Sequence, residues 1–562
     1  MTDHPDRPWL AHYPKGVPAE INLDEFSSIV DLLDNCFERF RHRPAYSNMG
    51  RTISYGELDI LSRQFASFLV NDLKCAKGDR IAMMMPNVLQ YPIAIAGALR
   101  AGLIVVNTNP MYTARELKHQ LEDSGATVVI VLENFAHTVA SVIAETHVKH
   151  VITTGIGDLL GFPKGVITNF VIRHVKKMVP AYKIDCAIRF NDSLSRGASG
   201  AVPKPGVTCD DIAFLQYTGG TTGVAKGAML THRNLIANMQ QAGAWIGTGM
   251  REGEEVIITA LPLYHIFALT ANCLTFMKLG GHNHLITNPR DMKGFVAELA
   301  RIRYTSLTGV NTLFNGLLHT PGFDKLDFSS LRMTLGGGMA VQRAVAERWK
   351  KVTGCTLAEA YGLTETSPAV CINPLTLADY NGSIGLPISS TEVNIQSDDG
   401  IPLAVGEIGE LCVRGPQVMK GYWNRPEETA QIIDAKGWLH TGDIARMDES
   451  GFFYIVDRKK DMILVSGFNV YPNEIEDVVA SMPGVLEVAA IGVPDEKSGE
   501  AVKLVVVRKD PTLTEEAIRA HCREELTGYK QPRIVEFRDS LPKSNVGKIL
   551  RRELRDSAPK HA

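Results

Sequence analysis

Short β-rich runs alternate with amphipathic, helix-like segments from residue 52 to about residue 350 of this chain. The runs at 80–84, 127–131 and 255–259 are examples. Because such alternation packs helices onto sheets, it predicts a layered α/β architecture. The full chain of 562 residues is too long for a single core, and the usual size of a domain predicts roughly three to four structural units.

The pattern changes twice in the last third of the chain. Short strands punctuated by Gly and Pro predict a small β subdomain over residues 384–456. A charged cluster at residues 457–461 marks a boundary, and a helix is expected to begin near Pro472, because proline suits a first helical turn. We expect an N-terminal domain over residues 1–456, a hinge at 457–461 and a small α+β domain over 462–562.

Bulk charge and cysteine usage exclude several functional classes. With 59 Lys and Arg against 62 Asp and Glu, the net charge of −3 gives no general attraction to nucleic acid, so any polyanion site must be local. Nine cysteines lack metal-ligand spacing, which favours reduced thiols in a cytoplasmic protein. The N-terminus lacks the basic and apolar regions of a signal peptide, so no export is expected.

The most apolar stretch, residues 91–106, does not predict a membrane-spanning helix. It contains Pro92 and Arg100, whereas a spanning helix needs about 20 predominantly apolar residues. We expect a buried helix that runs into a strand.

Residues 167–178 have the pattern of an interfacial helix, with an apolar face and a basic face. The apolar face comprises Ile167, Phe170, Val171, His174, Val175 and Met178, and the basic face comprises Arg173, Lys176 and Lys177. Peripheral association with the inner membrane is one reading of this pattern. The alternative is a surface helix whose apolar face packs on its own domain.

A loop rich in Gly and Thr, residues 217–227, follows an apolar run at 212–215 and predicts a polyphosphate site. Glycines let backbone N–H groups approach phosphate oxygens, threonine hydroxyls add donors, and lysine supplies positive charge. The proposed phosphate ligands are Thr218, Gly219, Gly220, Thr221, Thr222, Gly223 and Lys226. The chain is therefore expected to bind a nucleoside triphosphate, although a plain flexible turn is the alternative.

The same loop is not a Walker A motif. That motif has Gly before its lysine and Ser or Thr after it, whereas Lys226 lies between Ala225 and Gly227. Residues 227–230 are expected to form a short strand before a helix capped near Thr231.

Five further motifs follow the loop in order, and together they carry a family resemblance. They are Gly336-Gly-Gly338, Tyr361-Gly-Leu-Thr-Glu-Thr366, Trp438-Leu-His-Thr-Gly-Asp443, Asp457-Arg458 and Gly547-Lys548. The ordered set resembles the adenylate-forming superfamily of acyl-CoA synthetases, luciferases and peptide-synthetase adenylation domains. From about residue 13 to residue 556 the chain resembles the proteobacterial long-chain fatty acyl-CoA ligases of fatty acid degradation.

The resemblance implies a large layered N-terminal domain, a small mobile C-terminal domain and an active site in the cleft between them. It also implies that ATP, a long-chain fatty acid and coenzyme A are substrates, with acyl-AMP as the intermediate. Mg²⁺ is expected with the nucleotide, held by Glu365, because a carboxylate is a hard oxygen ligand. Relatives often form dimers, so a homodimer is a further expectation from the resemblance.

The site residues are expected from their chemistry and from the matching motifs. The catalytic candidates are Lys548, Glu365, Lys226 and Thr364, and the adenine and ribose contacts are Gly337, Gly338, Tyr361, Gly362, Asp443 and Arg458. Lys548 would stabilise charge as the carboxylate meets the α-phosphate. Taken singly, each has an ordinary reading: Glu365 as a surface charge, Tyr361 as core, Asp443 in a turn, Arg458 in an ion pair and Lys548 in a solvated tail.

By the same resemblance, the C-terminal domain turns about Lys460 so that a second face meets coenzyme A. Gly467 and Phe468 would then line the pantetheine channel, although Gly467 also suits an ordinary turn.

The acyl group would pass His265, Val310 and Asn311. His265 suits either a role at the carboxylate, as its orienting group or its gate, or a satisfied core histidine. A medium-chain or aryl acyl-CoA ligase and a non-catalytic lipid or nucleotide carrier with the same fold are the alternative functions.

Overall fold

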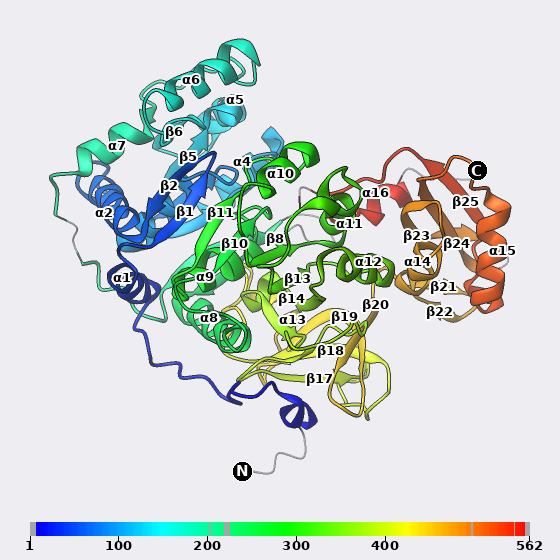
Figure 1. Ribbon diagram of the computed structural model, residues 1–562. Helices are drawn as coiled ribbons and strands as arrows, with labels where there is room; N and C mark the ends of the chain where they lie inside the picture. The colour runs from blue at the N-terminus through cyan, green and yellow to red at the C-terminus, as the bar shows by residue number, and fades with distance from the viewer. Residues whose placement is uncertain (1–6, 202–203, 219–224, 496–497, 545, 557–562) are drawn as a thin grey trace.

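The computed structural model describes residues 7–201, 204–218, 225–495, 498–544 and 546–556. A large α/β N-terminal domain precedes a small α+β C-terminal domain, which lies at one side of the molecule in Figure 1. The layered α/β fold with a β subdomain is therefore confirmed.

Seven strands form the first sheet, in the order β7-β6-β5-β3-β4-β8-β9 over the described residues. All neighbours are parallel except β8 and β9. The strands are β3 (Arg80–Met84), β4 (Ile104–Asn107), β5 (Val128–Leu132), β6 (His150–Thr154), β7 (Ile188–Arg189), β8 (Ile212–Thr218) and β9 (Lys226–Thr231).

Both faces of this sheet are buried, because successive side chains of a strand point to opposite faces. Ile81 and Met83 of β3 join the main core, whereas Ala82 and Met84 join a second core beneath α4 and α5. The uninterrupted apolar character of the strand follows from this double burial.

Nine described strands form the second sheet, in the order β16-β15-β14-β13-β12-β10-β11-β1-β2. Its centre is parallel and its two edges are antiparallel. The strands are β1 (Pro44–Asn48), β2 (Arg51–Ser54), β10 (Val256–Thr259), β11 (His282–Leu285), β12 (Ser306–Gly309), β13 (Met333–Gly337), β14 (Leu357–Gly362), β15 (Ala369–Ile372) and β16 (Leu386–Pro387).

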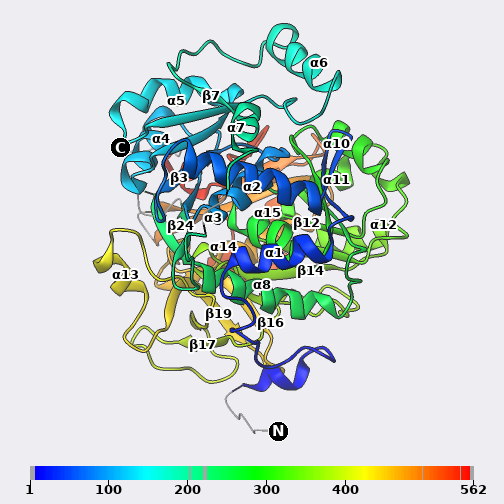
Figure 2. The ribbon, with the colours of Figure 1, turned by 90° about the vertical axis from the view of Figure 1, so that its left-hand side faces the viewer.

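Helices pack on these sheets and between them (Figure 2). All residues of α3 are buried, so residues 91–106 form the expected buried helix leading into a strand. The helices of this domain are α1 (Ile29–Arg39), α2 (Tyr55–Asn71), α3 (Gln90–Arg100), α4 (Ala114–Ser124), α5 (Ala136–Val142), α6 (Lys164–Phe170), α7 (Phe190–Gly197), α8 (His232–Gly247), α9 (Phe276–Lys278), α10 (Met292–Leu299), α11 (Asn311–His319), α12 (Arg343–Thr353) and α13 (Pro426–Ile432). The π-helical segments η4 (Val171–Val175) and η5 (Ala268–Thr275) and the 3-10 turn η7 (Thr364–Thr366) also belong to this domain.

Two smaller sheets complete the chain. The antiparallel sheet of the β subdomain has the order β17-β18-β19-β20, and β24 is central to the C-terminal sheet. Their strands are β17 (Glu392–Gln396), β18 (Gly409–Arg414), β19 (Leu439–Met447), β20 (Phe453–Arg458), β21 (Ile463–Val465), β22 (Phe468–Val470), β23 (Val485–Asp495), β24 (Gly499–Arg508) and β25 (Ile534–Arg538). The C-terminal helices are α14 (Pro472–Ala480), α15 (Glu515–Glu525) and α16 (Arg551–Asp556).

Several local expectations are confirmed by the boundaries. Helix α14 begins at Pro472, and Thr231 caps α8 by accepting the backbone N–H of Asn234. The searched, described part of the chain contains no helix that has both the length and the apolar character to cross a membrane.

Most of the apolar residues expected on one face at 167–178 are exposed, although Val171 is half-buried. Ile167, Phe170, Val175 and Met178 are each more than half exposed. These side chains face solvent, as in an interfacial helix, and do not pack inward as in an ordinary surface helix.

Gly362 closes β14 at a point where a side chain has no room. A Cβ there would lie 1.9 Å from the carbonyl oxygen of Pro368. We predict that Gly362→Ala destabilises the fold by about 1–3 kcal/mol or more, because overpacking forces the backbone apart. The measurement is thermal unfolding.

Gly247→Ala is the matched control for this substitution. A Cβ at Gly247, at the end of α8, meets nothing within 4 Å, and Ala is a better helix former than Gly. Its melting temperature should equal or exceed that of the parent. Equal melting of all three proteins would contradict the described closeness of β14 to Pro368.

Candidate functional site

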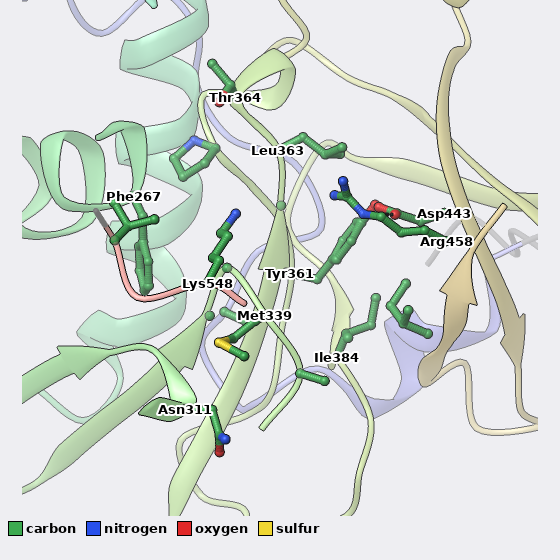
Figure 3. Close-up of a pocket in the computed structure, with 18 of the residues that line it drawn as sticks. Phe267, Asn311, Met339, Tyr361, Leu363, Thr364, Ile384, Asp443, Arg458 and Lys548 are labelled. Atoms are coloured by element: carbon green, nitrogen blue, oxygen red, sulfur yellow. Dashed lines mark hydrogen bonds and ion pairs between the residues drawn. The ribbon is translucent and has the colours of Figure 1, made fainter. Parts of the chain in front are cut away.

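A large cavity of about 1910 Å³ lies between the two domains and runs into the N-terminal domain. Its lining includes Tyr361, Asp443 and Arg458 of the larger domain and Lys548 of the smaller one. Figure 3 shows Tyr361 directed toward Asp443 and Arg458, with Lys548 nearby in the same pocket. The cavity therefore gathers most of the residues singled out from the sequence.

Asp443 is held between a tyrosine and an arginine at the floor of this cavity. Strands β19 and β20 are antiparallel, and their register places Asp443 opposite Arg458. Arg458 Nε lies 2.9 Å from Asp443 Oδ1, and the Tyr361 hydroxyl donates to Asp443 Oδ2 at 2.5 Å. Opposite charges on cross-strand partners attract, so the hairpin itself explains why the two motifs meet.

The environment keeps the Tyr361 hydroxyl protonated and Arg458 charged. Burial, and then the negative charge of Asp443, raise the pKa of Tyr361 well above its usual value, so its hydroxyl remains a donor. The negative charge of Asp443 also raises the pKa of Arg458 above its usual value. A carboxylate with two donors and a guanidinium beside it can receive the hydroxyls of a bound sugar by exchanging partners.

Lys548 reaches into the cavity from the C-terminal domain. Its Cε and Nζ would lie 3.4 and 3.9 Å from a Cβ placed on Gly338, which is ordinary van der Waals contact, so the lysine side chain lies beside this glycine. The Thr312 hydroxyl donates to the carbonyl oxygen of Gly547 at 3.0 Å, which ties the preceding residue to α11. The lysine is thereby presented to the N-terminal domain.

The ammonium of Lys548 is destabilised where it lies. Desolvation, and then the positive charge of Arg458, lower its pKa to about 8, although Asp443 and Glu365 act in the opposite direction. At neutral pH most of the lysine is charged. An added anion beside it would favour that charge.

The hinge segment is bound to the residues that follow Lys548. Asp457 accepts the backbone N–H of Asn473 at 2.9 Å, and Arg555 lies 2.8 Å from Asp461. Arg551 lies 3.5 Å from Asp461 and 2.8 Å from Glu476. Lys460 itself lines the cavity and is exposed. Desolvation and then Arg458 lower its pKa to about 8.

A second group of polar residues lies at the end of the predicted phosphate loop. Thr218 and Lys226 are register partners at the ends of β8 and β9. Lys226 forms an ion pair with Glu428 and lies 5.3 Å from the ring centroid of Tyr422. The Tyr422 hydroxyl donates to Glu365 at 2.7 Å. Lys226 and Glu365 are thus brought together through Tyr422.

Five of the predicted phosphate ligands cannot be placed. Gly219, Gly220, Thr221, Thr222 and Gly223 lie outside the described residues. The expected strand and helix after them are present as β9 and α8.

Tyr422 and Glu428 were missed by the sequence reasoning. They belong to residues 421–428, Gly-Tyr-Trp-Asn-Arg-Pro-Glu-Glu, where the aromatic pair and the proline before α13 were the available signal.

Thr364 and Glu365 lie in the turn η7 directly after β14, and both line the cavity. Gly337 and Gly362 line it as well. Among the described residues no group of three or more His, Cys, Asp or Glu side chains has metal-binding geometry. A lone carboxylate such as Glu365 fits Mg²⁺ that arrives with a nucleotide, because Mg²⁺ is usually held by one or two carboxylates and substrate phosphates.

The predicted acyl-site residues divide into those that line the cavity and one that does not. His265 and Asn311 line it, and Asn311 exchanges hydrogen bonds with Gln342. Val310 is buried. Burial, and then Lys548, lower the pKa of His265 to about 3. His265 is therefore neutral and offers a dipole rather than a charge.

The cavity continues past His265 between α8 and η5. Ala242 and Ile246 of α8, Thr275 of η5 and Phe276 of α9 line this part. These residues were also missed, because their spacing on helices is that of ordinary core positions. The cavity lining therefore combines charged residues with a mainly apolar set from α8, η5 and α9.

Gly467 and Phe468 are not brought to the cavity. Phe468 is 55% exposed on the C-terminal domain, and its ring stacks on Tyr529 with centroids 4.7 Å apart. Their predicted contact with coenzyme A is not made by this arrangement of the domains and stays a prediction.

Comparison with known proteins shows the family to which this chain is related. The profile of the AMP-binding enzyme family matches residues 33–423, and that of the AMP-binding enzyme C-terminal domain matches residues 474–548. A long-chain-fatty-acid–CoA ligase of Escherichia coli O157:H7 is 59% identical over 550 residues, which cover 98% of each chain.

Solved structures share the fold over nearly the whole chain. ATP-bound MatB from Rhodopseudomonas palustris has a TM-score of 0.79 and 28% identity, covering 94% of this chain and 98% of that one. An anthranilate CoA ligase in complex with anthranoyl-AMP has a TM-score of 0.84 and 24% identity, covering 96% and 99%, and is similar in fold. This chain belongs to the AMP-binding enzyme family.

Proposed function

We propose that this protein is an ATP-dependent ligase that joins a long-chain fatty acid to coenzyme A through an acyl-adenylate. The observation that carries the proposal is the 59% identity, over 98% of the chain, to a relative named for this reaction. The cavity supports it independently, because a lining that combines charged residues with mainly apolar ones suits a carboxylate joined to an alkyl chain. Neither feature favours a carrier or an aryl ligase.

The first half-reaction makes a good leaving group. A carboxylate oxygen attacks the α-phosphorus of ATP, the bond to the β-phosphate oxygen breaks, and pyrophosphate leaves. We assign Lys548 to the charge that builds between the carboxylate and the α-phosphate, because a preorganised cation stabilises that transition state. Its position beside Gly338 supports the assignment.

The remaining nucleotide contacts are assigned to residues that share the cavity with Lys548. Tyr361 would offer its face to adenine, with Gly337, Gly338 and Gly362 close to it, and Asp443 and Arg458 would bind the ribose. Thr218, Lys226 and Thr364 would contact the phosphates, together with the loop residues 219–223. Glu365 would hold Mg²⁺, which neutralises charge on the departing pyrophosphate.

In the second half-reaction the thiolate of coenzyme A attacks the acyl carbonyl carbon, and AMP leaves. We infer that the C-terminal domain, residues 462–562, turns about the hinge at 457–461 between the two steps. That turn would withdraw Lys548 and bring Gly467 and Phe468 to the thiol. The exposure of Phe468 supports this role, because the face of the C-terminal domain that carries it is open to solvent before the turn.

The alkyl chain would follow the part of the cavity between α8 and η5. His265 and Asn311 would lie beside the carboxylate, where a neutral imidazole contributes hydrogen bonding without trapping the anion. The cysteines of the chain are free thiols, which supports residence in a reducing compartment such as the cytoplasm. A homodimer stays a prediction.

The proposed function predicts strict dependence on four reactants. AMP and a thioester should appear when palmitate, ATP, Mg²⁺ and coenzyme A are combined, and removing any one should abolish the thioester. Comparison of hexanoate, benzoate and palmitate separates the acid classes, and palmitate should have the highest kcat/KM. Preference for benzoate, or no AMP with any acid, would overturn the proposal.

Lys548→Ala should separate the two half-reactions. We predict that it lowers the rate of acyl-adenylate formation about a hundredfold or more, because one preorganised charge contact is lost. Thioester formation from synthetic palmitoyl-AMP should remain near the parent rate. Single-turnover measurements of each step provide the test.

Lys460→Pro is the reciprocal control for Lys548→Ala. Proline fixes φ at the proposed pivot, so adenylation should persist while thioester formation slows. If both variants lose both steps equally, the division of labour between Lys548 and Lys460 is wrong.

The lowered pKa of Lys548 predicts an alkaline limb in the first half-reaction. Because the ammonium is the active form, kcat/KM for ATP should fall about tenfold per pH unit above pH 8. Lys548→Arg should be slower and lack this fall up to pH 9.5, because arginine stays charged. Lys460→Met should retain it, although Lys460 also has a pKa of about 8. An unchanged fall in Lys548→Arg would assign the limb to another group.

A further inference from the structure

A compact set of large apolar side chains is exposed on the helical projection formed by α6 and η4. We call it the apolar patch, and it comprises Phe162, Val166, Ile167, Phe170, Val175 and Met178. Phe162 is 91% exposed and Val175 is 65% exposed. Both ribbon views place α6 at the edge of the molecule (Figures 1 and 2). Exposed apolar clusters of this kind mark interaction surfaces.

Polar side chains, not apolar ones, attach this projection to the domain. Asn169 donates to Asp158 Oδ1 at 2.7 Å and accepts the backbone N–H of Gly157 at 2.7 Å. Arg173 lies 2.5 Å from Glu133, whose side chain is 6% exposed. A surface helix of a globular protein ordinarily turns its apolar stripe inward. Here the polar contacts face inward and the apolar patch faces solvent.

Close backbone packing fixes the same orientation. A Cβ on Gly165 would lie 2.3 Å from the carbonyl oxygen of Gly157, and the reverse distance is also 2.3 Å. The two glycines therefore hold α6 against the preceding loop. Rotation of the helix to bury the apolar patch would break this contact and the bonds of Asn169 and Arg173.

The segment that carries the apolar patch has only basic charged side chains, although Glu133 and Asp158 of the adjoining domain contact its inner side. Residues 159–184 contain five Lys and Arg and no Asp or Glu, although the whole chain has a net charge of −3. Lys176 and Lys177, at the end of η4, are exposed. This combination of apolar and basic side chains matches an anionic lipid surface, because the apolar groups enter the acyl boundary while ammonium groups stay with the headgroups.

We propose that the apolar patch and its adjoining lysines dock the protein onto an anionic lipid bilayer. This extends the proposed ligase function by naming where the enzyme meets the phase in which long-chain fatty acids dissolve. The helix would lie in the interface plane, with Phe162 and Phe170 inserted and Lys176 and Lys177 at the headgroups.

Sedimentation with sucrose-loaded vesicles, without ATP or coenzyme A, tests the proposal. The full-length protein should bind vesicles of mixed phosphatidylglycerol and phosphatidylcholine. Ile167→Glu with Phe170→Glu should weaken that binding at least about tenfold, because two inserted side chains become anions. Ile401→Glu with Val405→Glu is the matched control, because both residues are exposed and apolar but lie in the β subdomain. An equal loss in the control would overturn the proposal.

A second double variant and a second vesicle type test the contribution of the lysine charges to vesicle binding. Lys176→Glu with Lys177→Glu should weaken binding to the anionic vesicles about tenfold or more, since each basic residue near such a surface contributes several-fold in affinity. Binding of the parent to pure phosphatidylcholine should be weaker, and added salt should reduce binding to the anionic vesicles. Equal binding to both vesicle types would overturn the anionic assignment.

Ligase activity separates this proposal from the proposed function. With palmitate delivered from cyclodextrin, the Ile167 and Phe170 double variant should retain the parent kcat and melting temperature, because neither residue lines the cavity. Loss of vesicle binding with retained activity supports the docking surface, whereas a variant that binds normally contradicts it. If the double substitution instead abolishes a dimer seen by light scattering and leaves vesicle binding intact, the patch is a protein interface and the lipid proposal fails.

Discussion

The contact of Asp443 with Tyr361 and Arg458 is the interaction on which the geometry of the cleft depends. A carboxylate whose side chain is 4% exposed needs compensating donors and charge. Tyr361 lies near the end of β14 in the nine-stranded sheet, and Arg458 ends the last strand of the β subdomain. One buried carboxylate therefore joins two sheets and fixes where the chain leaves the N-terminal domain.

The position of Lys548 follows from that exit point through a network of ion pairs. Asp457 and Asp461 flank Lys460, and Arg551 and Arg555 follow Lys548 and bind this acidic pair. The hinge and the lysine segment are thus held together as one piece. In the proposed reaction this coupling lets a rotation at the hinge move Lys548 and the C-terminal face at the same time.

The sequence predicted those parts of the site whose residues lie in ordered motifs with strong local structure. Strands β8 and β9 and the cap at Thr231 follow from local patterns, and Tyr361, Asp443, Arg458 and Lys548 all reach one cavity. Tyr422, Glu428 and the lining from α8 were not predicted. Their positions depend on tertiary packing, because Tyr422 approaches Glu365 from a separate segment and Ile246 has the spacing of any core residue. The exposed apolar side of α6 was undecided for the same reason: periodicity defines a face but not its direction.

A crystal structure with a non-hydrolysable palmitoyl-adenylate analogue tests the account most directly. The account predicts ribose hydroxyls on Asp443, adenine against Tyr361, the Lys548 amine at the phosphoryl or acyl oxygen, and the alkyl chain between α8 and η5. A ligand bound with its ribose away from Asp443, or with its chain outside that part of the cavity, would contradict it.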